Sequence, residues 1–244
     1  LVAIALLPSI IAVGVAFILP APVAEGVDLA SQNADFFALG GTITMLFTAL
    51  AAPELLIPDR RDGVLSMLSS RPLTSTDYLT ARFVSLLTVV GAFLLLPQAV
   101  LFIGQIGTDP EGLAKGIVNA SDTLPKILLV AAIYVIAYVP LGFAIASLSN
   151  RKAIAASVYL AGMIALTAFA ETIVRNAAFN GARWFALITP INTADTANLA
   201  VFGKGTSGSL LATANIAPLI GVLALVAFAL VATTIAARRY RGLM

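Results

Sequence analysis

The chain has 244 residues, of which 60% are apolar and only 11% are charged, with a formal net charge of +2. Soluble domains carry about 25% charged residues, so this composition excludes a water-soluble globular protein and predicts an integral membrane protein. The sequence contains no cysteine and no histidine, which excludes disulfides, thiolate or imidazole metal sites and a cysteine nucleophile.

Six long apolar runs follow one another along the chain, and each is long enough to cross a hydrocarbon core of about 30 Å as a helix. They are continuously apolar rather than alternating, which favours helices over the strands of a membrane barrel. Because the chain begins at Leu1 inside an apolar run, we expect further sequence before it. We predict one all-α transmembrane domain over residues 1–244, with spans at about 1–19, 36–57, 83–106, 124–148, 153–174 and 216–236.

Basic residues predict the orientation, because lysine and arginine are enriched in cytoplasmic loops. We therefore place both termini in the cytoplasm and expect a multi-pass protein of the inner (plasma) membrane of a bacterium. The loops assigned to the cytoplasm hold Arg60, Arg61, Arg71, Arg82, Arg151, Lys152, Arg238, Arg239 and Arg241. The loops assigned to the outside hold most of the acids: Glu25, Asp28, Asp35, Asp109, Glu111, Asp122 and Asp195.

One carboxylate, Glu54, lies within the second span near its cytoplasmic end. A charge deep in lipid costs a few kcal/mol, so we expect Glu54 to reach the headgroup region and to pair with Arg60. A contact with a translocated substrate is the alternative for this residue.

The segment between the second and third spans, "PDRRDGVLSMLSSRPLTSTDYLTARF" (58–83), interrupts the apolar sequence with charges of both signs. Val64, Leu65 and Leu68 share one face of a short helix with Met67 beside them, which predicts an amphipathic helix in this loop.

This helix is predicted to end at Arg71, because the following Pro72 disfavours the helical conformation there. Thr74 and Asp77 have the spacing of a short capping box, so a second helix is expected to start here and to run through Tyr78 into the third span.

An exposed apolar face beside charges requires a partner. Anionic lipid headgroups would suit the arginines, but the carboxylates of Asp59, Asp62 and Asp77 would repel them. A docked cytoplasmic protein suits mixed charge better, and the amphipathic helix is therefore predicted to bind a protein, with the lipid surface as the alternative.

Towards the end of the chain, Glu171 precedes Arg175 by four residues, a spacing that predicts a helical ion pair rather than a substrate contact. The stretch "RWFALITPINTADTANLAVF" (183–202) is too apolar for an ordinary loop. Trp184 suits a membrane interface, and Pro190 precedes a helix-forming run. We predict short helices at, or dipping into, the outer leaflet here, with a plain external loop as the alternative.

The 58–83 segment resembles the first cytoplasmic loop of the type-2 ABC exporter permeases. In that family an acidic residue and a glycine precede an apolar helix, a serine-rich end, a proline and an aromatic residue. Asp59 stands where glutamate is usual, and Val64 stands where threonine is usual. "LITPINTADTA" (187–197) resembles the proline-containing start of the family's region before the last span, and the six spans and the short loop at 149–152 also agree. The residues that carry the loop resemblance are Asp59, Gly63, Val64, Met67, Leu68, Ser69, Pro72 and Tyr78.

The resemblance implies that the loop helix is a coupling helix held in a cleft of a cytoplasmic ABC ATPase. Two ATPase subunits and two permeases, identical or different, would form the working unit in the lipid bilayer. The coupling residues would be Asp59, Arg60, Arg61, Asp62, Gly63, Val64, Leu65, Met67, Leu68, Arg71, Pro72, Asp77 and Tyr78. The candidates for the translocation path or the interface are Glu54, Glu171, Arg175, Trp184 and Pro190.

The chain is expected to bind no ATP itself, so ATP and Mg²⁺ would be bound by the partner. The stretch "FGKGTSG" (202–208) is not a P-loop, because Asn198 replaces the first glycine and Gly205 follows the lysine. No catalytic residue, metal, cofactor or nucleic-acid partner is expected in this chain.

The sequence thus predicts the membrane subunit of an exporter, not an enzyme. No ionisable residue is expected in the middle of a span, which counts against an ion-driven carrier and favours export of an apolar or amphipathic substrate. The alternative is a passive channel or a membrane scaffold without an ATPase partner.

Overall fold

The structure is a computed structural model that describes residues 2–18, 29–62, 74–109, 112–176, 179 and 181–241. Every regular element in these ranges is a helix, in agreement with the predicted all-α class. A helix satisfies its backbone hydrogen bonds internally, which the interior of a membrane requires. The elements are α1 (Val2–Ile18), α3 (Leu29–Arg61), α5 (Ser75–Gly107), α6 (Leu113–Ala120), α7 (Thr123–Leu148), α8 (Lys152–Asn176), η1 (Ala182–Ile188), α9 (Pro190–Val201), α10 (Leu210–Thr213) and α11 (Pro218–Arg241).

Five of the described helices are long and apolar enough to cross a membrane: α3, α5, α7, α8 and α11. The chain is therefore a multi-pass membrane protein. α1 is also apolar, but it has 17 residues, which at 1.5 Å per residue cover about 26 Å. A sixth span at 1–19 and the cytoplasmic position of both termini remain predictions.

The helices α3 and α5 are longer than the apolar spans predicted at 36–57 and 83–106. Pro53 and Pro58 lie inside α3 without ending it, and the Asp62 backbone N–H donates to the Pro58 carbonyl at 2.8 Å. The polar flanks continue both helices because the i to i−4 backbone ladder does not require apolar side chains. The consequence is that charged turns of α3 and α5 extend the bundle at one end.

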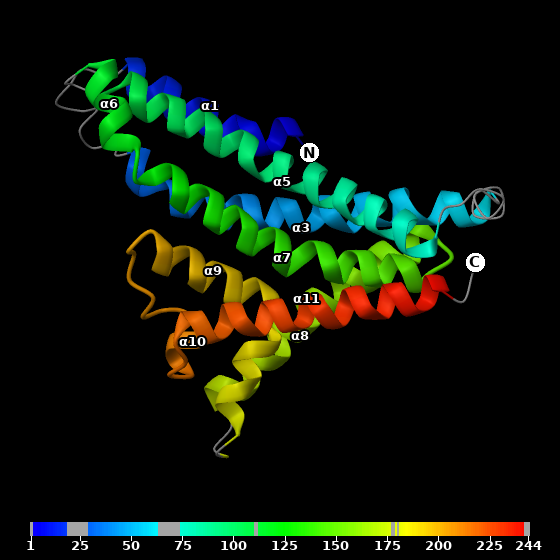
Figure 1. Cartoon of the computed structure of the whole chain (residues 1–244). Helices are drawn as coiled ribbons and strands as arrows, with labels where there is room; N and C mark the ends of the chain where they lie inside the picture. The colour runs from blue at the N-terminus through cyan, green and yellow to red at the C-terminus, as the bar shows by residue number, and fades with distance from the viewer. Residues whose placement is uncertain are drawn as a thin grey trace.

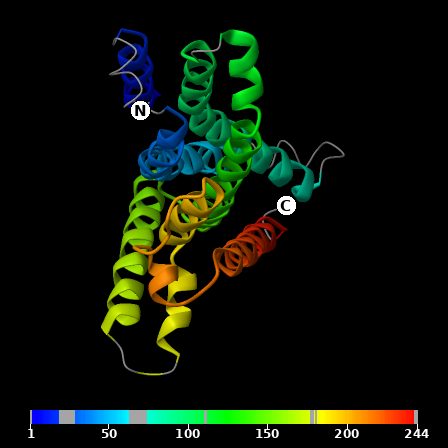
Figure 2. The same cartoon turned by 90° about the vertical axis from the view of Figure 1, so that its left-hand side faces the viewer.

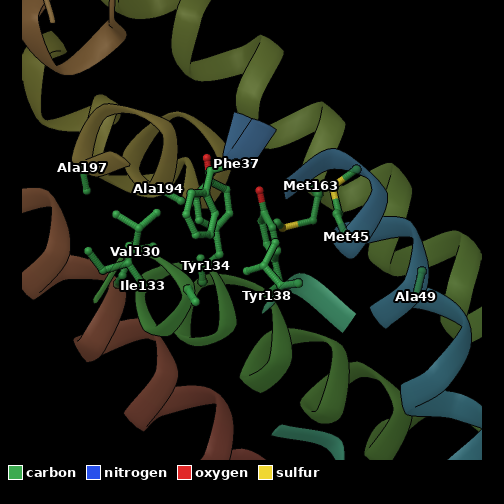
Figure 3. Packing of buried hydrophobic residues seen from close by; sticks show 14 of the residues in the cluster. Phe37, Met45, Ala49, Val130, Ile133, Tyr134, Tyr138, Met163, Ala194 and Ala197 are labelled. Carbon is green, nitrogen blue, oxygen red and sulfur yellow. The ribbon is translucent and has the colours of Figure 1, made fainter. Parts of the chain in front are cut away.

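α7 is the central helix of the bundle, with 67% of its most apolar window buried, against 22% for α8 and for α11. Figure 3 shows its Tyr134 and Tyr138 packed beside Phe37 of α3 and Met163 of α8. The Phe37 and Tyr134 rings stack with centroids 5.9 Å apart. α3 approaches α7 closely here because Gly41 has no side chain: a Cβ at this position would lie 2.3 Å from Tyr134 Cε1.

α1 and α5 pack along one another in the same direction. A Cβ on Gly104 would lie 2.5 Å from Val13, and one on Gly107 would lie 2.8 Å from Phe17, so the ends of the two helices coincide. Figures 1 and 2 agree that α1 and α6 lie on one side of the bundle, whereas α8 and η1 lie on the opposite side.

Three short helices, η1, α9 and α10, precede α11, as the sequence predicts. α9 packs against α7, α11 and α3, and Figure 1 shows it alongside α7 and α11. It begins at Pro190, where a missing N–H costs nothing, and this proline is buried. Trp184 of η1 is 48% exposed, with the Arg183 guanidinium 4.8 Å from its ring centroid. The position of these helices relative to the outer leaflet remains a prediction.

Candidate functional site

Basic residues gather where α3, α7 and α11 end and where α5 and α8 begin. This end of the bundle, called the basic end below, is on the right in Figure 1. α3 and α11 place arginines in their last turns, and α5 and α8 contribute Arg82 and Lys152 close to their starts. The predicted cytoplasmic loops therefore share one end of the structure.

The predicted coupling helix falls between α3 and α5, in residues 63–73, which lie outside the described residues. The structure describes both of its flanks, from Asp59 to Asp62 and from Thr74 to Tyr78. The predicted residues that fall outside the described part are Gly63, Val64, Leu65, Met67, Leu68, Arg71 and Pro72.

The two flanks are joined by a cluster around Asp59 of α3. The Tyr78 hydroxyl on α5 donates to Asp59 Oδ2 at 2.5 Å, and Arg82, one helical turn further, forms an ion pair with the same oxygen. The Asp59 side chain is only 16% exposed, and the Arg82 guanidinium lies 5.5 Å from the centre of the Tyr78 ring. Asp59, a predicted coupling residue, is thus held by two side chains of α5.

The start of α5 has the predicted capping box. The Thr74 side chain accepts from the Asp77 backbone N–H at 3.2 Å, while the Thr74 backbone N–H donates to Asp77 Oδ2 at 3.1 Å. These bonds satisfy free backbone donors in the first turn of a helix. They fix where α5 begins, and therefore hold Tyr78 in the register that faces Asp59.

Arg60 joins α3 to the end of α7. Its Nη1 donates to the Ser147 carbonyl at 2.5 Å, and its Nη2 donates to the Ala146 carbonyl at 2.8 Å and to the Ser149 carbonyl. The last carbonyls of a helix have no partner within the helix and carry its negative dipole end. A guanidinium at this position therefore caps α7 and ties it to α3.

Tyr240 brings α11 into the same cluster. It is fully buried, its ring lies 6.0 Å from that of Tyr78, and the Arg60 guanidinium lies 5.7 Å from its centroid. Cation–π contacts of this kind stabilise by about 0.5–2 kcal/mol. The end of α11 is thus packed against the flanks of the 63–73 segment.

Glu54 pairs with Lys152, not with Arg60 as the sequence analysis predicts. Lys152 Nζ lies 2.8 Å and 2.7 Å from the two carboxylate oxygens, and the side chains are 46% and 67% exposed for Lys152 and Glu54 respectively. Arg60 is directed to the end of α7 instead, because the unpaired carbonyls there offer it three acceptors. The Glu54 pair joins α3 to the first residue of α8.

Asp195, one of the acids assigned to the outside, lies in the stretch predicted to form short helices and is packed against the bundle. Asp195 lies in α9, and Tyr134 donates a hydrogen bond to its Oδ1 at 2.5 Å. Tyr134 lies near the middle of α7 (Thr123–Leu148), so Asp195 is packed against the centre of a spanning helix. Asn198, one turn further along α9, donates to the Ala34 carbonyl of α3 at 2.7 Å. Both contacts join residues that lie far apart in the sequence. The sequence gives one indication of them, which is the number of polar residues in 192–198.

Glu171 also has a partner other than the predicted one. It accepts from Asn192 Nδ2 at 3.1 Å, and in the described part of the chain no ion pair joins it to Arg175. Because Asn192 belongs to α9, this hydrogen bond joins α8 to α9.

The described side chains at the basic end form one network of hydrogen bonds, an ion pair and ring contacts. In the described ranges, no group of three or more acidic side chains could hold a metal ion. Instead, the cluster of Asp59, Arg60, Tyr78, Arg82 and Tyr240 fastens four helices, α3, α5, α7 and α11, to the two flanks of one segment. A comparison of the sequence with protein-family models and with curated proteins finds no match.

Proposed function

We propose that this chain is the membrane-spanning permease subunit of an ATP-driven ABC exporter of the type-2 class. ATP would be hydrolysed by a separate cytoplasmic ATPase, and the chain would provide the path for an apolar or amphipathic substrate. Two copies, or this chain and a related one, would assemble with two ATPase subunits. The five spans, the apolar α1 and the short helices before α11 support the proposal.

The observation that carries the proposal is the cluster around Asp59. A loop that only connected two spans would need a few residues and no ties to the rest of the bundle. Here both flanks of the 63–73 segment are fastened, to each other through Asp59 and to α7 and α11 through Arg60 and Tyr240. A force on this segment therefore reaches four helices together.

The mechanism follows from this connection. ATP binding closes the ATPase dimer, and the closure moves the docked segment 63–73. Since the flanks of this segment are joined to α7 and α11, its movement tilts these helices as well as α3 and α5. A ligand shifts such an equilibrium only if it binds the two states with unequal affinity, and the docked segment is where that difference acts.

The test uses the absence of cysteine from the chain. A single cysteine introduced as Met67→Cys is the only thiol, so a thiol-reactive crosslinker in native membranes joins it only to a neighbour of the 63–73 segment. We expect a crosslinked ABC ATPase, identified by mass spectrometry, and no such product from Ser207→Cys near α10. A permease purified under gentle conditions with no ATPase attached would contradict the proposal and favour the channel or scaffold.

A second measurement tests coupling instead of contact. In the reconstituted complex, Met67→Glu or Leu68→Glu should leave basal ATPase activity measurable and abolish its dependence on transport, because a carboxylate cannot dock in an apolar cleft. Equal transport-linked ATPase activity in wild type and both variants would show that this face does not contact the ATPase.

A further inference from the structure

A groove runs between α3 and α8 near the basic end. Its first part is lined almost entirely by apolar side chains of the two spanning helices, among them Phe47, Leu50, Pro53 and Ala156. This part has a volume of about 380 Å³, within the range of roughly 300–1,000 Å³ typical of small-molecule sites. An apolar hollow on the side of a membrane bundle suits a hydrocarbon chain.

The second part of the groove opens at the basic end and is charged. It has a volume of about 420 Å³ and is lined by Arg61, Asp62 and Arg151 among others. Lys152 and Ala153 line both parts, so the apolar and the charged hollows lie next to each other. We call the whole the α3–α8 groove.

Among the residues that the structure describes, the charges at the mouth of the α3–α8 groove do not balance. Glu54 and Lys152 neutralise each other. The side chains of Arg61, Asp62 and Arg151 make no ion pair or hydrogen bond with the described residues. The described side chains of Arg61, Asp62 and Arg151 together leave a net charge of +1 at the mouth.

The structure weakens one objection to an anionic lipid at this end. The sequence analysis disfavours anionic headgroups because of three nearby carboxylates. Asp62 lines the mouth beside Arg61 and Arg151 and is the one negative charge counted there. Asp59 does not line the groove. In the structure that carboxylate faces the bundle and is neutralised by Arg82 and Tyr78. It therefore does not repel an anion in the groove.

We propose that the α3–α8 groove binds one phospholipid with a singly charged anionic headgroup. One acyl chain would lie in the apolar part between α3 and α8, and the phosphate would lie at the mouth between Arg61 and Arg151. Guanidinium groups bind phosphate oxygens in a bidentate geometry, and the start of α8 adds a helix N-terminus that favours an anion. This proposal is independent of the ATPase partner.

The test is native mass spectrometry of the purified full-length chain in detergent, titrated with phosphatidylglycerol and, separately, with phosphatidylcholine. We expect one tightly bound phosphatidylglycerol and markedly weaker phosphatidylcholine. The double variant Arg61→Gln/Arg151→Gln should weaken phosphatidylglycerol binding about fivefold for each arginine, the order of one basic residue's contribution near an anionic surface. Its control, Arg238→Gln/Arg239→Gln, removes the same charge from α11 outside the groove and should bind as wild type.

A second variant tests the apolar part. Ala156→Leu adds bulk between α3 and α8 without changing charge, and it should weaken binding of both lipids while the melting temperature stays close to that of wild type. Two results would overturn the proposal: equal affinity for the two lipids, or equal weakening of phosphatidylglycerol binding by the groove variant and the α11 variant. Either result would mean that the basic end attracts lipid without a specific site.

Discussion

The contact between Asp59 and Tyr78 predicts a measurable coupling between α3 and α5. Removing the carboxylate in Asp59→Ala leaves the buried Tyr78 hydroxyl and the Arg82 guanidinium without their partner. A hydrogen bond to a charged group contributes about 1.5–3 kcal/mol, whereas the ion pair, with Arg82 34% exposed, adds about 0.2–1 kcal/mol. We expect Asp59→Ala to lower the free energy of unfolding by about 2–3 kcal/mol, and Tyr78→Phe by about 1–2 kcal/mol.

A double-mutant cycle isolates the contact itself. If the 2.5 Å hydrogen bond accounts for most of both losses, the double variant Asp59→Ala/Tyr78→Phe should be only slightly less stable than Asp59→Ala alone. The coupling energy should then be about 1–2 kcal/mol, measured by reversible unfolding in mixed micelles. For independent sites, the loss of unfolding free energy in a double variant equals the sum of the two single losses to within about 0.3–0.5 kcal/mol. Such additivity here would show that Asp59 and Tyr78 do not join the two flanks.

Two further pairs of variants test the contacts of α7. Gly41→Ala should destabilise the protein by about 1–3 kcal/mol, since the new Cβ would lie 2.3 Å from the fully buried Tyr134 ring. Its control is Gly162→Ala, where a Cβ would meet nothing within 4 Å, and this variant should change the melting temperature little. Arg60→Gln should cost about 1.5–3 kcal/mol, because it removes charged donors from the end of α7, whereas Arg61→Gln, which is exposed, should stay within about 0.5 kcal/mol of wild type. Equal melting temperatures within either pair, in thermal unfolding of the detergent-solubilised protein, would refute the corresponding contact.

The sequence predicts those features that are determined locally. Continuous apolarity is a direct requirement of the lipid, so the positions of α3, α5, α7, α8 and α11 could be read from it. The capping box at Thr74 and Asp77 could also be predicted, because its two residues are three positions apart and bond to each other's backbone.

The pairing of charged side chains could not be predicted, because it depends on how helices distant in sequence are rotated against each other. Glu54 has an arginine close by in the sequence but meets Lys152, 98 positions away. Asp195 lies in the stretch predicted to form short helices, but its partner Tyr134 is 61 positions away on α7. The ends of α3 (Leu29–Arg61) differ from the predicted span at 36–57 for another reason: the apolar pattern stops where lipid contact stops, whereas the helix continues.

The two polar regions of the bundle are connected by the same two helices. α3 carries Asp59 and Arg60 at the basic end, and towards its other end it accepts the Asn198 hydrogen bond at Ala34. α7 accepts Arg60 at its last carbonyls, and near its middle Tyr134 donates to α9. α3 and α7 also meet between these regions, where Gly41 lies against Tyr134 and Gly142 lies against Thr48, so in the proposed exporter a displacement at the 63–73 segment would be passed along both helices to α9. In the proposed exporter, α9 is therefore the element whose movement would follow that of the docked segment.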